Sequence, residues 1–230
     1  MSKMPPTKPL SKFQKLSLLG KVRDGIVTQK YKPGERLNET SLAREFQVTR
    51  ITVREALMQL EEHGLVIHQP RRGMFVNNLS ELETQQINGV RIVLEAEVLA
   101  LCRANATREM IRHLEGLVVR MERWQAGTQL EAAELDLEFH RAIWRHSGNT
   151  YLAKTLNSLL PILFAHRALE GINDDRLRWI LGRHRRLLDF IEGNTQDSAE
   201  ATILDHLQTG YTNPERFSSL VLETTLQSVR

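Results

Sequence analysis

Four residues in the C-terminal part of the chain have the side chains and the spacing of a divalent-metal site. Asp136 and His140 are four positions apart, so one helix would present both on the same face. His184 and His206 each fall within the apolar pattern of a later predicted helix, on the side facing a core. Imidazole nitrogen and carboxylate oxygen are donor atoms that first-row divalent metals bind. The set predicts a metal centre inside a helical bundle, with Zn, Ni or Mn as the ion.

Each of these histidines, taken alone, has an alternative interpretation as a hydrogen-bonded core residue. Their occurrence together favours the metal. Arg91, on the inward face of another predicted helix, needs an anionic partner if it is buried. Two partners remain open: an internal carboxylate such as Glu95, or the carboxylate of a small effector bound by the guanidinium fork. We expect Arg91 and Glu95 to mark an effector site beside the metal.

Residues 38–76 carry a second chemistry, which is DNA recognition. A short helix capped by Asn38, a turn at 47–49 and a longer helix capped by Thr49 would form a helix-turn-helix. Gly64 would end the longer helix, and strands at 65–68 and 74–76 would form a wing. The start of the second helix enters the major groove in this motif, where arginine binds guanine or phosphate. The residues expected to contact DNA are Thr49, Arg50, Thr52, Arg54, Arg71, Arg72 and Gly73. The alternative is a solvated basic face.

The elements that must position these side chains are mostly helical. A helix at 16–29 precedes the DNA-binding stretch, and every strong period after residue 80 is helical. The predicted later helices are 81–103, 108–125, 130–147, 151–166, 174–192 and 198–211. The predicted fold class is therefore mainly α: an N-terminal winged helix-turn-helix domain followed by an all-helical antiparallel bundle.

The predicted domain limits follow from these patterns and from composition. We expect a disordered segment at 1–9, a DNA-binding domain at 10–79 and an effector-binding and dimerisation domain at 80–230. The tail at 214–230 contains apolar residues that would form an extra helix or a partner contact, namely Phe217, Leu220, Val221 and Leu222.

The charge is unevenly distributed along the 230 residues. The net charge of +3 combines +7 for residues 1–78 with −4 for the remainder, so the N-terminal third suits a nucleic acid. The single cysteine, Cys102, allows no internal disulfide and its apolar surroundings favour a buried structural thiol in a reducing compartment. No signal peptide or membrane-spanning apolar run is visible, so we expect a cytoplasmic protein.

Both halves of the chain resemble a known family. The DNA-binding stretch is similar to the GntR family of bacterial transcription regulators at Pro33-Gly34-Glu35-Arg36-Leu37, Val48-Thr49-Arg50, Val53-Arg54-Glu55-Ala56-Leu57 and Gly64-Leu65-Val66. The bundle resembles the FCD effector domain of the FadR subfamily, in its six-helix, VanR-like branch. This second resemblance rests on Arg91-Ile92-Val93-Leu94-Glu95, Asp136-Leu137-Glu138-Phe139-His140 and Ser147-Gly148-Asn149, followed by His184 and His206.

The resemblance implies a homodimer that binds a palindromic double-stranded operator as a repressor. It also implies a metal held by Asp136 and the three histidines, with a small carboxylate effector beside it. The chain departs from the family at Thr40, Ile51 and Thr52, so an operator sequence cannot be transferred.

Two other functions compete with a ligand-responsive regulator. The first is a regulator whose metal is purely structural and which has no small effector. The second is a metalloenzyme with Glu95 or Glu138 as its base, because histidines and a carboxylate also form catalytic metal sites. The winged helix argues against the enzyme, since hydrolysis or oxygenation does not need a DNA-binding domain.

Overall fold

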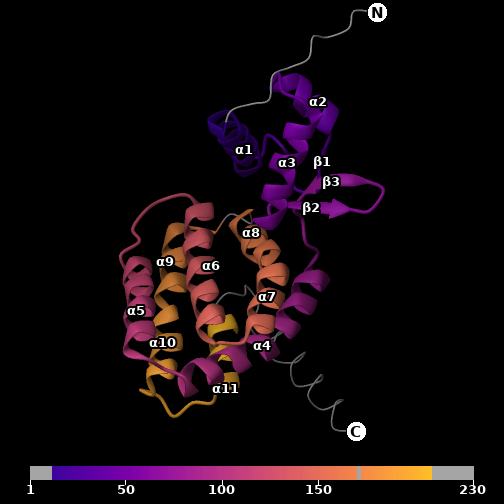
Figure 1. Cartoon of the computed structure of the whole chain (residues 1–230). Coiled ribbons are helices and arrows are strands. Elements are labelled where there is room, and N and C mark those ends of the chain that lie inside the picture. The colour runs from indigo at the N-terminus through magenta and orange to yellow at the C-terminus, as the bar shows by residue number, and fades with distance from the viewer. Residues whose placement is uncertain (1–11, 170–171, 209–230) are drawn as a thin grey trace, which may run out of the picture. The chain divides into compact units, whose positions relative to one another are not determined.

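The computed structural model describes residues 12–169 and 172–208, and the chain divides into two compact units (Figure 1). The N-terminal unit contains the residues up to Asn78 together with Pro161–Leu169, and the bundle unit contains Leu79–Leu160 and the residues after 169. The predicted disordered segment at 1–9 and the apolar residues of the tail at 214–230 lie outside the described residues.

The N-terminal unit is a winged helix-turn-helix. Its elements are α1 Lys12–Val27, β1 Arg36–Leu37, α2 Glu39–Glu45, α3 Arg50–Glu62, β2 Val66–Gln69, β3 Gly73–Val76 and α8 Pro161–Leu169. The predicted caps are present. The Asn38 side-chain oxygen accepts from the amides of Thr40 and Ser41, and the Thr49 hydroxyl accepts from the amide of Thr52. These caps fix where α2 and α3 begin, and hence the turn between them.

The wing belongs to a three-stranded sheet with the strand order β1-β3-β2. The hairpin of β2 and β3 was predicted, but β1 was not. Arg36 and Leu37 pair antiparallel with Phe75 and Met74, and two residues are too few to give a periodic pattern. The short strand holds the base of the wing against the chain that leads into α2.

The predicted helix at 151–166 is wrong as a single element, because the structure has α7 Thr150–Leu159 and then α8. Pro161 lacks an amide hydrogen and its ring clashes with the preceding turn, so it starts a new helix. Within the N-terminal unit, the Asn77 side-chain amide donates to the carbonyl oxygens of Gly64 and Ile162, each at 2.7 Å. A Cβ on Gly64, whose φ is 74°, would lie 2.2 Å from the Pro161 carbonyl, so this contact requires glycine.

The bundle unit is helical throughout its described residues. Its helices are α4 Glu81–Ala104, α5 Arg108–Glu122, α6 Gln129–His146, α7 Thr150–Leu159, α9 Asp174–Gly182, α10 His184–Glu192 and α11 Ala199–Gln208. Capping boxes at Ser80 and Thr128 start α4 and α6. The long helix α4 packs against α6, α10 and α11, so residues on these helices can meet in one core (Figure 1).

The predicted helix at 174–192 is also wrong as a single element, since it breaks at Arg183 between α9 and α10. The amides of Arg183 and Arg186 donate to carbonyls three residues earlier, at 3.1 and 3.2 Å. The ring nitrogen Nδ1 of His184 lies 3.0 Å from the Leu181 carbonyl oxygen, which accepts from the amide four residues later in a regular helix. A side chain that takes part in the backbone ladder is a known cause of such breaks.

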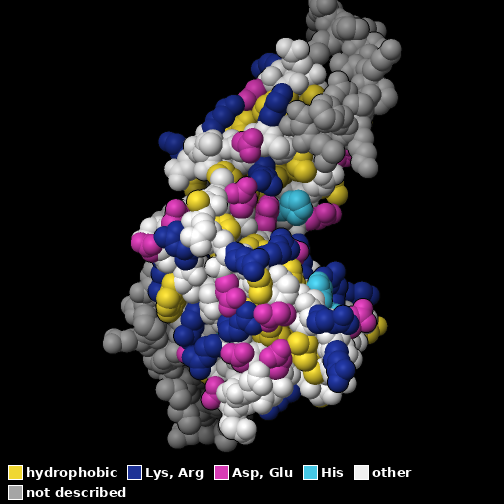
Figure 2. Space-filling model, turned by 90° about the vertical axis from the view of Figure 1, so that its left-hand side faces the viewer, with side chains coloured by type: hydrophobic (Ala, Val, Ile, Leu, Met, Phe, Trp, Pro, Cys, Tyr) yellow, Lys and Arg dark blue, Asp and Glu magenta, His cyan; other side chains and the backbone are white. Residues whose placement is uncertain are grey.

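On the surface, charges of both signs are mixed. Figure 2 shows Lys and Arg side chains interspersed with Asp and Glu side chains on one face of the described residues. A search of the described helices finds none with the length and apolar character needed to cross a membrane.

Candidate metal centre and DNA-binding surface

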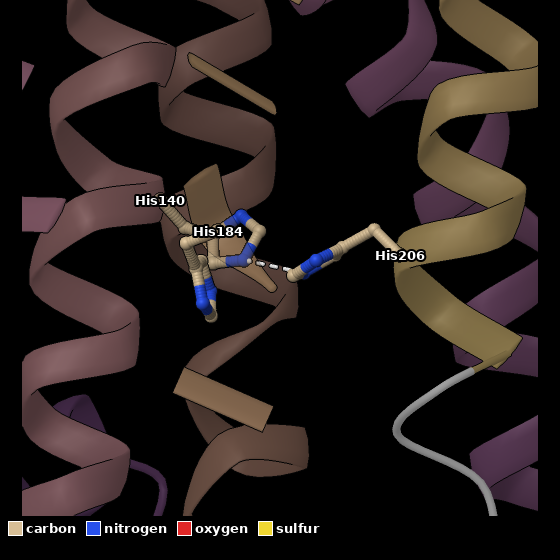
Figure 3. A group of neighbouring side chains, drawn as sticks. All are labelled: His140, His184 and His206. Carbon is tan, nitrogen blue, oxygen red and sulfur yellow. Dashed lines mark hydrogen bonds between the residues drawn. The ribbon is translucent and has the colours of Figure 1, made fainter. Parts of the chain in front are cut away.

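Three imidazoles from three different helices meet in the core of the bundle unit. His140 comes from α6, His184 from α10 and His206 from α11, and all three are buried. Each offers one ring nitrogen to a group whose atoms lie within 4.8 Å of one another. Figure 3 shows the ring of His206 projecting from α11 towards the other two rings. The structure thus brings together the three histidines that the sequence singled out.

Asp136 joins this cluster through two of its histidines. Its Oδ1 atom lies 2.8 Å from Nε2 of His184 and 3.4 Å from Nε2 of His140, and Nε2 of His140 lies 3.2 Å from Nε2 of His206. Metal bonds of about 2.0–2.2 Å place neighbouring donor atoms roughly 2.9–3.5 Å apart. The separations between these four donor atoms therefore fit a common ion.

The hydrogen bonds of His184 show that its Nε2 atom faces a site for a positive charge. Its Nδ1 donates to the Leu181 carbonyl oxygen, which has no proton to give. The lone pair on Nε2 then faces Oδ1 of Asp136 at 2.8 Å. Because two lone pairs repel at this distance, a proton or a cation must lie between the two atoms. A metal ion would replace that proton.

Arg91 and Glu95, expected at an effector site, instead bind each other and the histidine cluster. Both side chains are fully buried on α4. The Nε atom of Arg91 donates to Oε2 of Glu95 at 2.6 Å, and its Nη2 lies 3.1 Å from Nε2 of His140. The structure gives Arg91 the internal partner that the sequence left open. We therefore do not assign Arg91 and Glu95 as effector ligands, because their charges already compensate one another.

Trp144 is a residue of this site that the sequence analysis did not single out. Its indole nitrogen donates to Oε1 of Glu95 at 2.8 Å, and the same oxygen lies 2.8 Å from Nδ1 of His140. Trp144 follows His140 by four positions, just as His140 follows Asp136, so this spacing was the signal that could have revealed it.

The carboxylates nominated as enzyme bases are both engaged elsewhere. Oε1 of Glu138 accepts from Arg120 at 2.9 Å on the exposed side of α6, and Glu95 is bound as described above. Cys102 is buried in α4 with its thiol donating to the Ile143 carbonyl oxygen, and burial raises its pKa to about 12. This agrees with the predicted structural thiol, since a nucleophile needs an accessible thiolate.

At the start of α3, the proposed DNA-binding arginines are exposed and share one acidic partner. Arg54 donates through Nε and Nη2 to the two carboxylate oxygens of Glu39, each at 2.9 Å, and Arg50 lies 3.6 Å from the same carboxylate. Hydrogen bonding to Arg54 lowers the pKa of Glu39. Glu39, on α2, was not anticipated, and it holds the guanidinium of Arg54 beside the first turn of α3.

The other predicted contacts on α3 have different surroundings. Thr52 is only 7% exposed, and its hydroxyl lies 2.9 Å from that of Thr49, so this pair stabilises the helix start. We therefore leave Thr52 out of the proposed DNA-binding set. Ile51, which the sequence noted only as a departure from the family, is 70% exposed next to Arg50. An exposed apolar side chain there suits the methyl group of thymine.

The tip of the wing carries the remaining predicted contacts. Arg71 has a φ of 63° and Gly73 a φ of 103°, which create the tight turn between β2 and β3. The guanidinium of Arg72 lies 5.2 Å from the centre of the Phe75 ring, an arrangement that stiffens a basic side chain while leaving its charge available. The wing therefore presents two arginines from a turn of fixed shape.

Comparison with known proteins matches both units to described families. Residues 15–76 match the family of "Bacterial regulatory proteins, gntR family", and residues 86–209 match the FCD domain, more than half of the chain. The uncharacterized HTH-type transcriptional regulator YdhC of Bacillus subtilis is 30% identical over 83% of this chain and 86% of its own. The chain belongs to the GntR family.

Other GntR-type regulators support this at lower identity. The Nta operon transcriptional regulator of Aminobacter aminovorans is 27% identical over 79% of this chain and 85% of its own. The HTH-type transcriptional repressor RspR of Escherichia coli is 25% identical over 88% of each chain. Among solved structures, E. coli McbR/YncC superposes with a TM-score of 0.63 at 20% identity, covering 94% of this chain and all of that one, which shows the fold alone. This GntR-family member is a DNA-binding transcription regulator with an FCD domain.

Proposed function

We propose that this GntR-family regulator represses transcription, and that a small organic acid bound beside a divalent metal in the bundle unit controls its operator binding. One relative, RspR, carries the name of a repressor. The observation that carries the proposal is the convergence of His140, His184, His206 and Asp136 in a buried site. We expect the protein to act in the cytoplasm, where its operator lies.

The ligand set leaves room for an effector. Four protein donors leave one or two positions free on a five- or six-coordinate ion. A carboxylate oxygen is a hard anionic ligand and suits such a position on Zn, Ni or Mn. The metal, rather than Arg91, would then hold the acid, since Arg91 is bound to Glu95.

Elemental analysis of the untagged full chain tests the metal. We expect about one equivalent of metal per chain after incubation with Zn, Ni or Mn and removal of the excess. His184→Ala should lose it, because Nε2 of His184 and Oδ1 of Asp136 face the ion together. A metal-to-chain ratio near zero for the parent after all three incubations would end the proposal.

A matched control guards against adventitious binding at the surface. Nδ1 of His113 and Nε2 of His146 lie 2.9 Å apart on the outside of α5 and α6, and such a pair takes up metal weakly. His113→Ala should therefore keep the tightly bound equivalent that His184→Ala loses. The opposite pattern would place the metal at this surface pair.

Thermal shift with a panel of small carboxylic acids separates an effector-binding site from a purely structural metal. A ligand that binds only the folded, metal-loaded chain raises its melting temperature, and the same acid should have no effect after chelation. Operator affinity should then change by about 5–150-fold, which corresponds to a coupling of roughly 1–3 kcal/mol. A panel without any metal-dependent shift would favour the structural metal.

The homodimer in this proposal has a candidate surface on α4. Leu82, Val90 and Val93 are 62%, 47% and 69% exposed and lie on one face of the helix. Gly89, on the same face, has nothing within 4 Å of the position of a Cβ, so another helix can approach closely. Two-fold pairing through such a stripe would present two α3 helices to the half-sites of a palindromic operator.

A further inference from the structure

The carboxylate of Glu95 lies in the core of the bundle unit but does not face the metal position directly. Its side chain is completely buried, and ionised carboxylates are buried only where donors replace their water. Three donors surround it: Nε of Arg91 at 2.6 Å on Oε2, and Nδ1 of His140 and the indole nitrogen of Trp144, each at 2.8 Å, on Oε1. Burial would raise the pKa of Glu95, but Arg91 and His140 outweigh that effect and lower it to about 2.

An ionised Glu95 decides where the proton of His140 must be. The carboxylate has no hydrogen, so the short contact to Nδ1 requires that Nδ1 carries one. In a neutral imidazole the lone pair is then on Nε2. This is the atom that lies 3.2 Å from Nε2 of His206 and 3.4 Å from Oδ1 of Asp136. Glu95 therefore directs the lone pair of His140 into the group of metal donors.

The contact between Arg91 and His140 is consistent with this arrangement. Nη2 of Arg91 lies 3.1 Å from Nε2 of His140 and donates to its lone pair in this structure. A metal bound to Nε2 would replace that hydrogen bond, while the bond from Nε of Arg91 to Glu95 would hold the carboxylate in place. Such outer partners of a ligating histidine raise its basicity and fix its orientation.

We propose that Glu95 is a positioning residue of the metal centre, which holds His140 as the Nδ1–H tautomer so that Nε2 faces the ion. The proposal rests on the metal site proposed above. It assigns to Glu95 the orientation of a ligand, in place of contact with an effector or with the metal itself.

The first test needs no metal. Long-range ¹⁵N–¹H NMR of the metal-free full chain, with histidine labelled and the signals of residue 140 identified by their loss in His140→Gln, distinguishes the two tautomers. We expect protonated Nδ1 and unprotonated Nε2. An Nε2–H tautomer for His140 would overturn the proposal, and this holds even if a Glu95 variant does not fold.

The second test compares metal affinity in Glu95→Gln with a matched control, Glu97→Gln, an exposed glutamate on the same helix. Competition of each full-length variant with a chromophoric chelator for Zn²⁺ gives the affinity, and circular dichroism checks folding. Loss of an outer carboxylate weakens metal binding about 10–100-fold. We expect this for Glu95→Gln, together with a loss of the pure Nδ1–H signal of His140, and no change for Glu97→Gln.

The outcomes separate this proposal from the proposed function. If the parent binds metal and a folded Glu95→Gln binds it as tightly as Glu97→Gln does, Glu95 is not a positioning residue. If the parent binds no metal, the proposed function fails, and the NMR spectrum still decides the tautomer that Glu95 selects.

Discussion

Arg54 is the side chain on which we expect operator binding to depend most at the level of single residues. Its exposed guanidinium is held by both oxygens of Glu39 at the start of α3, so little freedom is lost when it meets a base or phosphate. Arg54→Ala should weaken operator binding by about 1–3 kcal/mol. Fluorescence anisotropy with a labelled operator measures this. Arg112→Ala, which removes an exposed arginine from α5, serves as the control, and equal binding by both variants would show that α3 is not the recognition helix.

Cys102 should be unreactive as long as the chain is folded. Burial raises its pKa to about 12, so at pH 8 the thiolate is roughly 10,000-fold less abundant than the thiol. We expect no stoichiometric labelling by a thiol reagent at pH 8 and one equivalent per chain in denaturant, since the chain has one cysteine. Rapid labelling of the native protein would mean that α4 opens around this residue.

At the level of elements, the outer face of α4 is where we expect the dimer to be sensitive to substitution. Val93 is 69% exposed in the middle of the stripe that also contains Leu82 and Val90. Val93→Glu would place two like charges in a symmetric interface, which disfavours pairing. Sedimentation at micromolar concentration should show a dimer for the parent and a shift to monomer for the variant. Tyr151→Glu, at a more exposed residue on α7, should remain dimeric.

For the whole molecule, DNA binding should be strongly dependent on salt. Residues 1–78 have a net charge of +7, and the wing adds Arg71 and Arg72 at its tip. The logarithm of the affinity should fall linearly with the logarithm of the salt concentration, with a slope of about −0.9 per neutralised phosphate. Arg72→Ala should make this slope less steep by about 1 and leave sequence preference unchanged. A slope identical to that of the parent would remove the wing from the DNA-binding surface.

Metal removal should destabilise the protein, because the ligands come from α6, α10 and α11. At a free metal concentration about 100 times the Kd, binding stabilises the folded state by roughly 2.7 kcal/mol, or about 5–10 °C in melting temperature. Calorimetry with and without chelator measures the difference. His184→Ala should melt at the same temperature in both conditions, and a parent that ignores the chelator would contradict a metal that links these helices.

Much of the architecture followed from local sequence patterns. Apolar periodicity and the caps at Asn38 and Thr49 predicted the winged helix-turn-helix and the helical bundle, because these signals act over a few residues. The same periodicity placed His184 and His206 on inward faces, and the structure brings both to His140. A side chain on the apolar face of a core helix has few other places to go.

The partners of these residues were decided by the tertiary structure. Sequence spacing shows which face of a helix a residue occupies, but the residue that it meets across the core depends on how the helices pack. Arg91 was therefore left with two possible anions until α4 and α6 were seen to place Glu95 between it and His140. The break at Arg183 has the same origin, since the apolar pattern continues through it and only the bond from His184 to Leu181 interrupts the helix.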